Sequence, residues 1–129
     1  MQAMALVYVM MGGAIGSMLR YVITALIARP GDMTFPYGTI CVNILGSFLM
    51  GAWIATMAHW LPERGRDMNL LFAVGVLGGF TTFSTFSLDI FYLFERGAIT
   101  QAAIYILSSV ICSVLALVLG MFIVSKIIN

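Results

Sequence analysis

The chain has 129 residues, of which 62% are hydrophobic and only 9% are charged, and its formal net charge is +1. Soluble domains carry about 25% charged residues, so this composition excludes a typical water-soluble enzyme, and its high hydrophobicity excludes a disordered chain. The near-balanced charge gives no basic surface for nucleic acid, which leaves an integral membrane protein.

Four apolar stretches are long enough to be transmembrane helices, which need about 20 residues to cross the bilayer. They cover about residues 4–28, 37–60, 69–94 and 99–125. Short polar joints separate them at residues 29–32, 61–67 and 95–97. The last joint is short enough to force an antiparallel helix hairpin. We therefore predict an all-α protein with one membrane domain of four helices over residues 1–129, which leaves no room for the nucleotide-binding domain of an ATP-driven pump.

The first span contains a glycine-rich fragment at residues 12–16 (GGAIG). Because Gly12 and Gly16 are four residues apart, they share one helix face, and this spacing is typical of close helix packing in membranes. The fragment is not set between a strand and a helix, so it does not indicate a nucleotide site. The span is too long for a cleaved signal peptide, and it has no basic residue at its start.

The second span carries an asparagine, Asn43, about one turn into an apolar helix. An amide inside the membrane is costly unless its polar atoms find partners. Two interpretations stay open at this point. Asn43 lines a polar pathway, or it holds two helices together through hydrogen bonds.

The third span contains a segment poorly suited to a continuous helix, residues 75–87 (GVLGGFTTFSTFS). Five of the seven residues from Thr81 to Ser87 are serine or threonine, and glycine and threonine are poorer helix formers than alanine. We therefore predict a non-helical break, which must be buried in protein or line a wet cavity because lipid cannot satisfy its backbone. The alternative is a helix whose hydroxyls bond back to carbonyl groups one turn earlier.

Three phenylalanines in this segment, Phe80, Phe83 and Phe86, repeat every three residues. If the segment is helical, they share one face. A phenylalanine stripe is more often a packing surface than a site, but here it lies among hydroxyl groups. Because an aromatic ring has a positive edge, a ring turned edge-on can attract an anion without carrying a charge.

The fourth span has one polar stripe, because Tyr105, Ser109 and Ser113 follow one another at intervals of four residues. With the polar groups of the second and third spans, these side chains form an inventory of neutral hydrogen-bond donors. The only charged residues in or near the span bodies are Arg20 and Asp89. Neutral donors could replace the water around a small anion while holding it weakly enough to release it, as conduction requires.

Basic residues are nearly balanced between the two sides of the membrane. Four spans put both termini on the side of the second joint, with Arg64, Arg66 and Lys126, and leave Arg29 and Arg96 on the other side, with Arg20 within reach. Membrane orientation follows the Lys/Arg difference between sides, and here that difference is zero or one. Because four helices are also few for shielding a polar pathway, we hypothesise an antiparallel homodimer whose two copies face opposite ways.

The sequence resembles the Fluc family of fluoride channels, small four-helix proteins also called CrcB. The resemblance covers essentially the full length and rests on three motifs, the last of them highly specific: residues 12–21 (GGAIGSMLRY), 38–48 (GTICVNILGSF) and 78–87 (GGFTTFSTFS). It implies a dual-topology, antiparallel homodimer with two fluoride pores, which agrees with the charge count.

The resemblance implies pore positions residue by residue. Phe83 and Phe86 match the two pore phenylalanines of the family, and Asn43 matches its pore asparagine. The other implied pore residues are all hydroxyl donors, namely Thr39, Ser84, Thr85, Tyr105, Ser109 and Ser113.

Further positions are implied outside the pore itself. Backbone carbonyls of Gly78 and Thr81 match the positions that hold a structural sodium ion on the dimer axis of the family. Arg20 matches an arginine that would sit at a vestibule and draw anions in. The role of Asp89, which stands where the family often has glutamate, stays open, and Phe80 is assigned no ion contact.

The function implied by the resemblance is passive fluoride export that limits fluoride toxicity, by a channel rather than an enzyme, in a bacterial inner membrane. Its partners would be fluoride, membrane lipid and a second copy of the chain. The runner-up is a small multidrug-resistance-type, proton-coupled exporter, which needs an acidic residue in the first span, and residues 4–28 have none. A third interpretation, a membrane subunit that only packs against partners, would leave Asn43 and the third-span segment unexplained.

Overall fold

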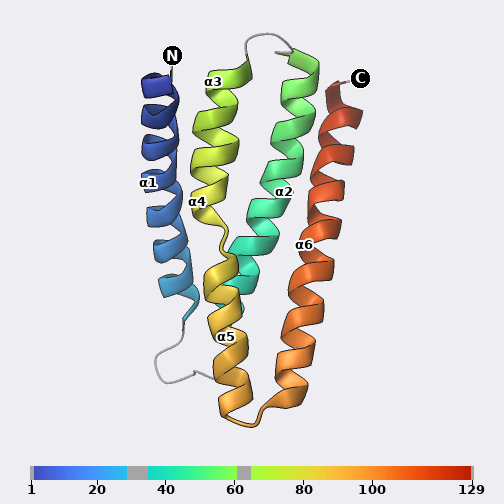
Figure 1. Ribbon diagram of the computed structural model, residues 1–129. Helices are drawn as coiled ribbons and strands as arrows, with labels where there is room; N and C mark the ends of the chain where they lie inside the picture. The colour runs from blue at the N-terminus through green and yellow to red at the C-terminus, as the bar shows by residue number, and fades with distance from the viewer. Residues whose placement is uncertain (1, 29–34, 61–64, 129) are drawn as a thin grey trace.

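The computed structural model describes residues 2–28, 35–60 and 65–128. Its elements, shown in Figure 1, are the α-helices α1 (Gln2–Ile27), α2 (Tyr37–Trp60), α3 (Gly65–Asn69), α4 (Gly78–Phe80), α5 (Phe83–Glu95) and α6 (Ile99–Ile128), and the π-helix η1 (Leu70–Leu77). Four helical stretches of the described chain are long and apolar enough to cross a membrane, namely Ala3–Ile27, Tyr37–His59, Gly65–Glu95 and Ile99–Ile128. The predicted all-α fold with four spans is confirmed.

The predicted joints differ from the structure in detail. Helix α3 begins at Gly65, so the second half of the joint predicted at 61–67 is helical, and residues 61–64 lie outside the described residues. The joint at 29–32 also lies outside them. Between α5 and α6 the chain reverses at Gly97, whose φ of 70° is a conformation that favours glycine. The predicted antiparallel hairpin is confirmed, since α5 and α6 run side by side in opposite directions (Figure 1).

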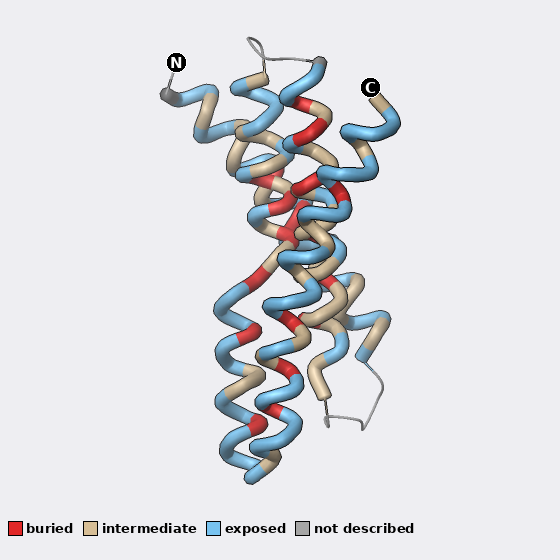
Figure 2. The backbone as a smooth tube through the Cα atoms, turned by 90° about the vertical axis from the view of Figure 1, so that its right-hand side faces the viewer, coloured by how far each residue is buried: buried red, intermediate tan, exposed pale blue. Residues whose placement is uncertain are grey.

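The spans pack as two pairs joined through the third span. Helix α1 packs along η1 and α4, α2 packs along α6, and α5 packs against α6. Figure 2 shows buried residues gathered between the helices at mid-height and along the facing sides of α5 and α6, while most of the outer surface is exposed. An apolar exposed surface is expected where lipid, rather than water, covers the protein.

Glycines bring α1 and the third span into backbone contact. A Cβ atom on Gly12 would collide with the carbonyl oxygen of Leu71, and one on Gly16 would collide with that of Val76. The third span contributes Gly75 and Gly79 to this contact, because a Cβ atom on either would meet the α1 backbone, at 2.8 and 2.7 Å. The predicted small-residue packing face of the first span is therefore confirmed.

We expect Gly16→Ala to lower the free energy of unfolding by about 1–3 kcal/mol, because the added methyl group must push α1 away from the third span. Gly13→Ala is the matched control, since a Cβ atom there meets nothing within 4 Å. Thermal unfolding in detergent, followed by circular dichroism, compares the two variants. Equal stability of both would contradict the close contact between α1 and η1.

The hairpin of α5 and α6 encloses a small apolar core. Its buried members are Phe86 and Leu93 on α5 and Ala102 and Tyr105 on α6. Leu93, Ala102 and Tyr105 have no exposed surface at all. The polar groups described next include two residues of these helices, Asp89 of α5 and Tyr105 of α6.

Candidate functional site

The backbone between α4 and α5 leaves the helical conformation for two residues. Thr81 has φ −84° and ψ 159°, and Thr82 has φ −151° and ψ 123°, both extended. The Thr81 hydroxyl and amide both donate to the carbonyl oxygen of Leu77, at 3.0 and 3.1 Å. Thr82 is the N-cap of α5, and its hydroxyl oxygen accepts from the Thr85 amide at 3.2 Å. Threonine suits this position because a hydroxyl satisfies a helix-start donor.

Asn43 holds the extended segment to α2. Its Nδ2 donates to the carbonyl oxygen of Thr82 at 3.1 Å, and its Oδ1 accepts from the Thr82 amide at 2.8 Å. Through these two bonds the side-chain amide of Asn43 satisfies both the N–H and the C=O of Thr82, as the backbone of a neighbouring β-strand would. An asparagine amide has two N–H groups, so one hydrogen of Nδ2 is left for a ligand. Asn43 therefore joins two helices and can still donate to an ion.

Hydroxyl groups cluster at the start of α5. The Thr82 hydroxyl donates to Oγ1 of Thr85 at 3.1 Å and lies 3.3 Å from Oγ of Ser84. Thr82 is buried, whereas Ser84, Thr85 and Ser87 are exposed on the single chain. The two hydroxyl residues expected along an ion route, Ser84 and Thr85, thus lie beside the residue that Asn43 holds.

The three phenylalanines do not form one helical stripe. Phe80 is on α4, 4% exposed, and its ring lies against Gly46 of α2. The extended residues separate it from Phe83 and Phe86, so a shared helix face is limited to these two. Their ring centroids are 5.5 Å apart, and Phe86 also contacts the Tyr105 ring at 5.2 Å. Phe86 is 6% exposed and Phe83 is 78% exposed, so only one of the pair is enclosed by its own chain.

Asp89 joins three spans through a single carboxylate oxygen. The Thr39 hydroxyl of α2 donates to Oδ2 of Asp89 at 2.8 Å, and the Tyr105 hydroxyl of α6 donates to the same atom at 2.9 Å. Thr39 is buried and Tyr105 is fully buried. The sequence did not indicate this contact, because the three residues are far apart in the chain.

The polar stripe of α6 lies at the same height in the fold as polar residues of α2. The two helices run in the same direction (Figure 1), Thr39 and Tyr105 meet at Asp89, and a Cβ on Gly51 would collide with the Leu117 carbonyl oxygen. Thr39 and Gly51 are as far apart along α2 as Tyr105 and Leu117 are along α6. The residues of α2 between Thr39 and Gly51 therefore stay level with those of α6 between Tyr105 and Leu117. It places Asn43 level with Ser109. We call these two stripes together the donor ladder, made of Thr39, Asn43, Ser47, Tyr105, Ser109 and Ser113.

Two buried hydroxyls of this ladder lack partners. Within the described residues, the Oγ atoms of Ser109 and Ser113 are buried and make no hydrogen bond. Ser109 is 4% exposed. A neighbouring serine, Ser108, instead donates to the Ile104 carbonyl at 2.6 Å, as helix serines usually do. Unsatisfied buried donors cost free energy, so these two hydroxyls are candidates for binding a ligand.

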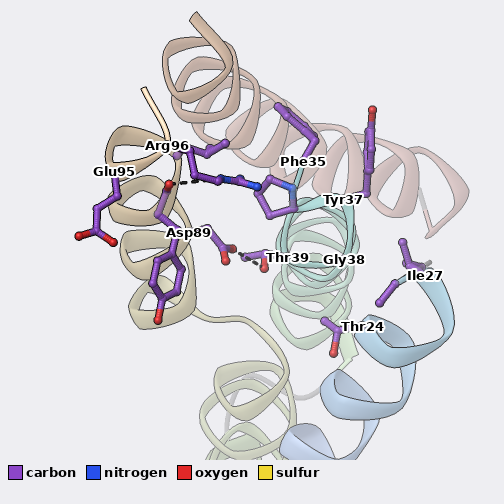
Figure 3. Close-up of a pocket in the computed structure, with 13 residues that line it drawn as sticks. Thr24, Ile27, Phe35, Tyr37, Gly38, Thr39, Asp89, Glu95 and Arg96 are labelled. Carbon is purple, nitrogen blue, oxygen red and sulfur yellow. Dashed lines mark hydrogen bonds between the residues drawn. The ribbon is translucent and has the colours of Figure 1, made fainter. Parts of the chain in front are cut away.

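A groove of about 1010 Å³ leads to the lower end of the ladder. Helices α1, α2 and α5 and residues at their ends supply its walls, which include Thr24, Tyr37, Glu95 and Arg96. Figure 3 shows Asp89 and Thr39 side by side within it. Arg20, expected at a vestibule, does not line this groove. Its carbonyl oxygen accepts from the Thr24 hydroxyl at 2.8 Å.

The positions expected for a sodium ion lie on either side of Phe80. Gly78 is exposed at the start of α4, and Thr81 is half-buried in the extended segment. No group of three or more His, Cys, Asp or Glu side chains gathers as metal ligands in the described part of the chain. Backbone carbonyls remain the oxygen donors that the sequence suggests, and hard oxygen ligands suit a hard cation.

The fold and the donor ladder define a small membrane protein that has four spans and uncharged hydrogen-bond donors along α2 and α6. A profile of the CrcB family, described as CrcB-like protein, Camphor Resistance (CrcB), matches residues 7–121. The chain therefore belongs to the CrcB family, as the sequence motifs predicted.

Three relatives illustrate the match, and each bears the name fluoride-specific ion channel FluC. The protein of Agrobacterium fabrum is 48% identical over 110 residues, which is 85% of this chain and 87% of the relative. That of Chelativorans sp. is 43% identical over 122 residues, 95% and 97% of the two chains. That of Ruegeria sp. is 50% identical over 114 residues, 88% of each chain.

Proposed function

We propose that this protein is a fluoride channel that lets fluoride leave the cell passively and so limits fluoride toxicity, in the inner membrane of a bacterium. The observation that carries the proposal is the pair of buried hydroxyls of Ser109 and Ser113 on α6, which have no hydrogen-bond partner among the described residues. The names of the three relatives, each a fluoride-specific ion channel, point to the same ion.

The chemistry of the ladder suits a small, strongly hydrated anion. Moving an ion from water into the membrane interior has a large desolvation cost, so the protein must supply substitutes for the lost water. The Asn43 amide, the Ser109 and Ser113 hydroxyls and the positive ring edge of Phe86 can do so without charge. Neutral donors bind weakly enough to release the ion, which conduction requires.

The antiparallel homodimer belongs to the same proposal. The start of α5 exposes Phe83, Ser84, Thr85 and Ser87 on a single chain, next to the extended backbone. Polar groups and non-helical backbone at membrane depth need cover by protein or water. A second copy facing the opposite way would cover them, and the near-zero Lys/Arg difference supports both orientations. Each dimer would then have two pores.

A structural sodium ion fits this dimer. Carbonyl groups of Gly78 and Thr81 provide two oxygen donors per chain, beside the residues that the partner would cover. Two copies would supply four such donors, whereas one chain alone leaves Gly78 exposed. The ion would tie the two extended segments together.

The runner-up, a proton-coupled multidrug exporter, is not favoured. Such a mechanism needs a carboxylate in the first span, and α1 contains neither aspartate nor glutamate. The match of residues 7–121 to the CrcB family also speaks against it.

We expect the chain to insert in both orientations, so that some copies have both termini inside the cell and others have both termini outside. Reporter fusions at the C-terminus, one active only inside the cell and one active only outside, should both give signal, because neither orientation is preferred. Ser125→Lys adds one positive charge on the side of the termini and should shift the signal toward the inside. A wild-type signal confined to one side would contradict dual topology.

Expression in bacterial cells that lack fluoride export tests the function itself. We expect the wild-type protein to restore growth in fluoride medium and to lower the fluoride content of the cells. Equal growth with and without the protein, at verified membrane expression, would count against the proposal.

A further inference from the structure

Asp89 lies where the groove meets the donor ladder. Asp89 and Thr39 line the groove, but Tyr105 does not, and it has no exposed surface. Figure 3 shows the Asp89 carboxylate pointing toward Thr39 inside the groove. An ion that enters from the groove therefore meets Asp89 before it can reach Tyr105 or Ser109.

The hydrogen bonds of this carboxylate compete with an anion. A hydroxyl group has one hydrogen to donate, and both Thr39 and Tyr105 give theirs to Oδ2 of Asp89. A fluoride ion would need the same two hydrogens. In this arrangement the first two donors of the ladder are occupied by the protein's own anionic group, while Ser109 and Ser113 beyond them are unoccupied.

We propose that Asp89 is a gate: its carboxylate holds the Thr39 and Tyr105 hydroxyls, and fluoride advances along the ladder only when the carboxylate releases them. The inference rests on the proposed fluoride channel and adds a step that limits its rate. Repulsion between two negative charges in a low-dielectric site opposes the approach of fluoride. Displacement of the carboxylate then supplies two donors at once.

The competing explanation is that Asp89 only ties α5 to α2 and α6. The two explanations differ for Asp89→Asn, which keeps an oxygen of similar position to accept from the hydroxyls but removes the negative charge. A structural tie would leave fluoride flux unchanged or reduced in this variant. A gate predicts faster flux, because the resident group binds the donors less strongly and no longer repels the ion.

Fluoride release from proteoliposomes separates these outcomes. We expect Asp89→Asn to raise the initial rate about tenfold, since removing about 1.4 kcal/mol from a barrier gives that factor. Asp89→Glu keeps the charge and should be no faster than wild type. Asp67→Asn is the matched control, because it makes the same change in an exposed residue of α3 outside the groove and ladder; its rate should equal that of wild type.

Each result has one meaning. A wild-type protein that releases no fluoride would overturn the channel proposal itself. A conducting wild type with Asp89→Asn equally fast or slower would overturn the gate and leave the channel standing.

Infrared spectroscopy gives a second readout that does not depend on the folding of Asp89→Asn. Adding fluoride to the wild-type protein should shift a carboxylate stretching band, because Oδ2 loses its two hydrogen bonds. Chloride should produce no such shift, and Thr39→Val, which removes one of the donors, should produce a smaller one. No fluoride-specific shift in a conducting wild-type protein would contradict the gate.

Discussion

Replacing Asn43 with aspartate is expected to stop fluoride release, with a loss of about 100-fold or more in rate, equivalent to at least about 2.7 kcal/mol in barrier height. A carboxylate can no longer donate to the Thr82 carbonyl at 3.1 Å, so two oxygens would face each other there. The new negative charge would also stand level with Ser109, on the path of the anion. Initial release rates from proteoliposomes, measured with a fluoride electrode, check the result.

Asn69→Asp is the matched control for this substitution. Asn69 lies on α3 and accepts a hydrogen bond from the Trp53 indole at 2.8 Å, which an aspartate oxygen can also accept. It should therefore keep the wild-type rate. If Asn43→Asp conducts normally while folding as wild type does, Asn43 does not line the path.

Phe86→Ile is expected to have the second largest effect, a fall in fluoride release of at least about tenfold. Isoleucine still fills an apolar site, so the hairpin core with Leu93 and Ala102 should persist. What it lacks is the aromatic ring, whose centroid lies 5.2 Å from that of the Tyr105 ring, and with it the positive ring edge. The loss would appear in the rate and not in the thermal unfolding of the purified protein.

Phe91→Ile makes the same change on the same helix and serves as the control. Phe91 is exposed and its ring contacts only the Tyr92 ring among the aromatic contacts described, at 6.0 Å. We expect no change in rate. Unchanged release by Phe86→Ile as well would remove the ring-edge part of the account.

The four spans could be predicted because a membrane helix is a local property of composition and length. The hairpin at Gly97 follows for the same reason, since a three-residue joint leaves no other arrangement. The position of the extended residues was also accessible, as glycine and threonine in residues 78–87 disfavour a helix there. The boundary at Gly65 was missed because charged Arg66 and Asp67 look like a joint, yet charges are tolerated at a helix end.

The site was less accessible to sequence reasoning because its contacts join distant parts of the chain. The sequence indicates that the Asn43 amide needs a polar partner, but it does not identify Thr82 as that partner. A threonine just before a helical segment is nevertheless an N-cap signal. The role of Asp89 stayed open because neither Thr39 nor Tyr105 points to it in sequence. The placement of Phe80 apart from Phe83 followed from the extended backbone between them.

The central claim is that uncharged donors along α2 and α6 carry fluoride across the membrane. The most direct test is the initial efflux of fluoride and of chloride from proteoliposomes that contain the purified protein. The account predicts fluoride efflux at least about 100-fold faster than chloride efflux, a difference of about 2.7 kcal/mol in barrier height. Equal rates for the two halides, or no fluoride efflux above that of protein-free liposomes, would contradict it.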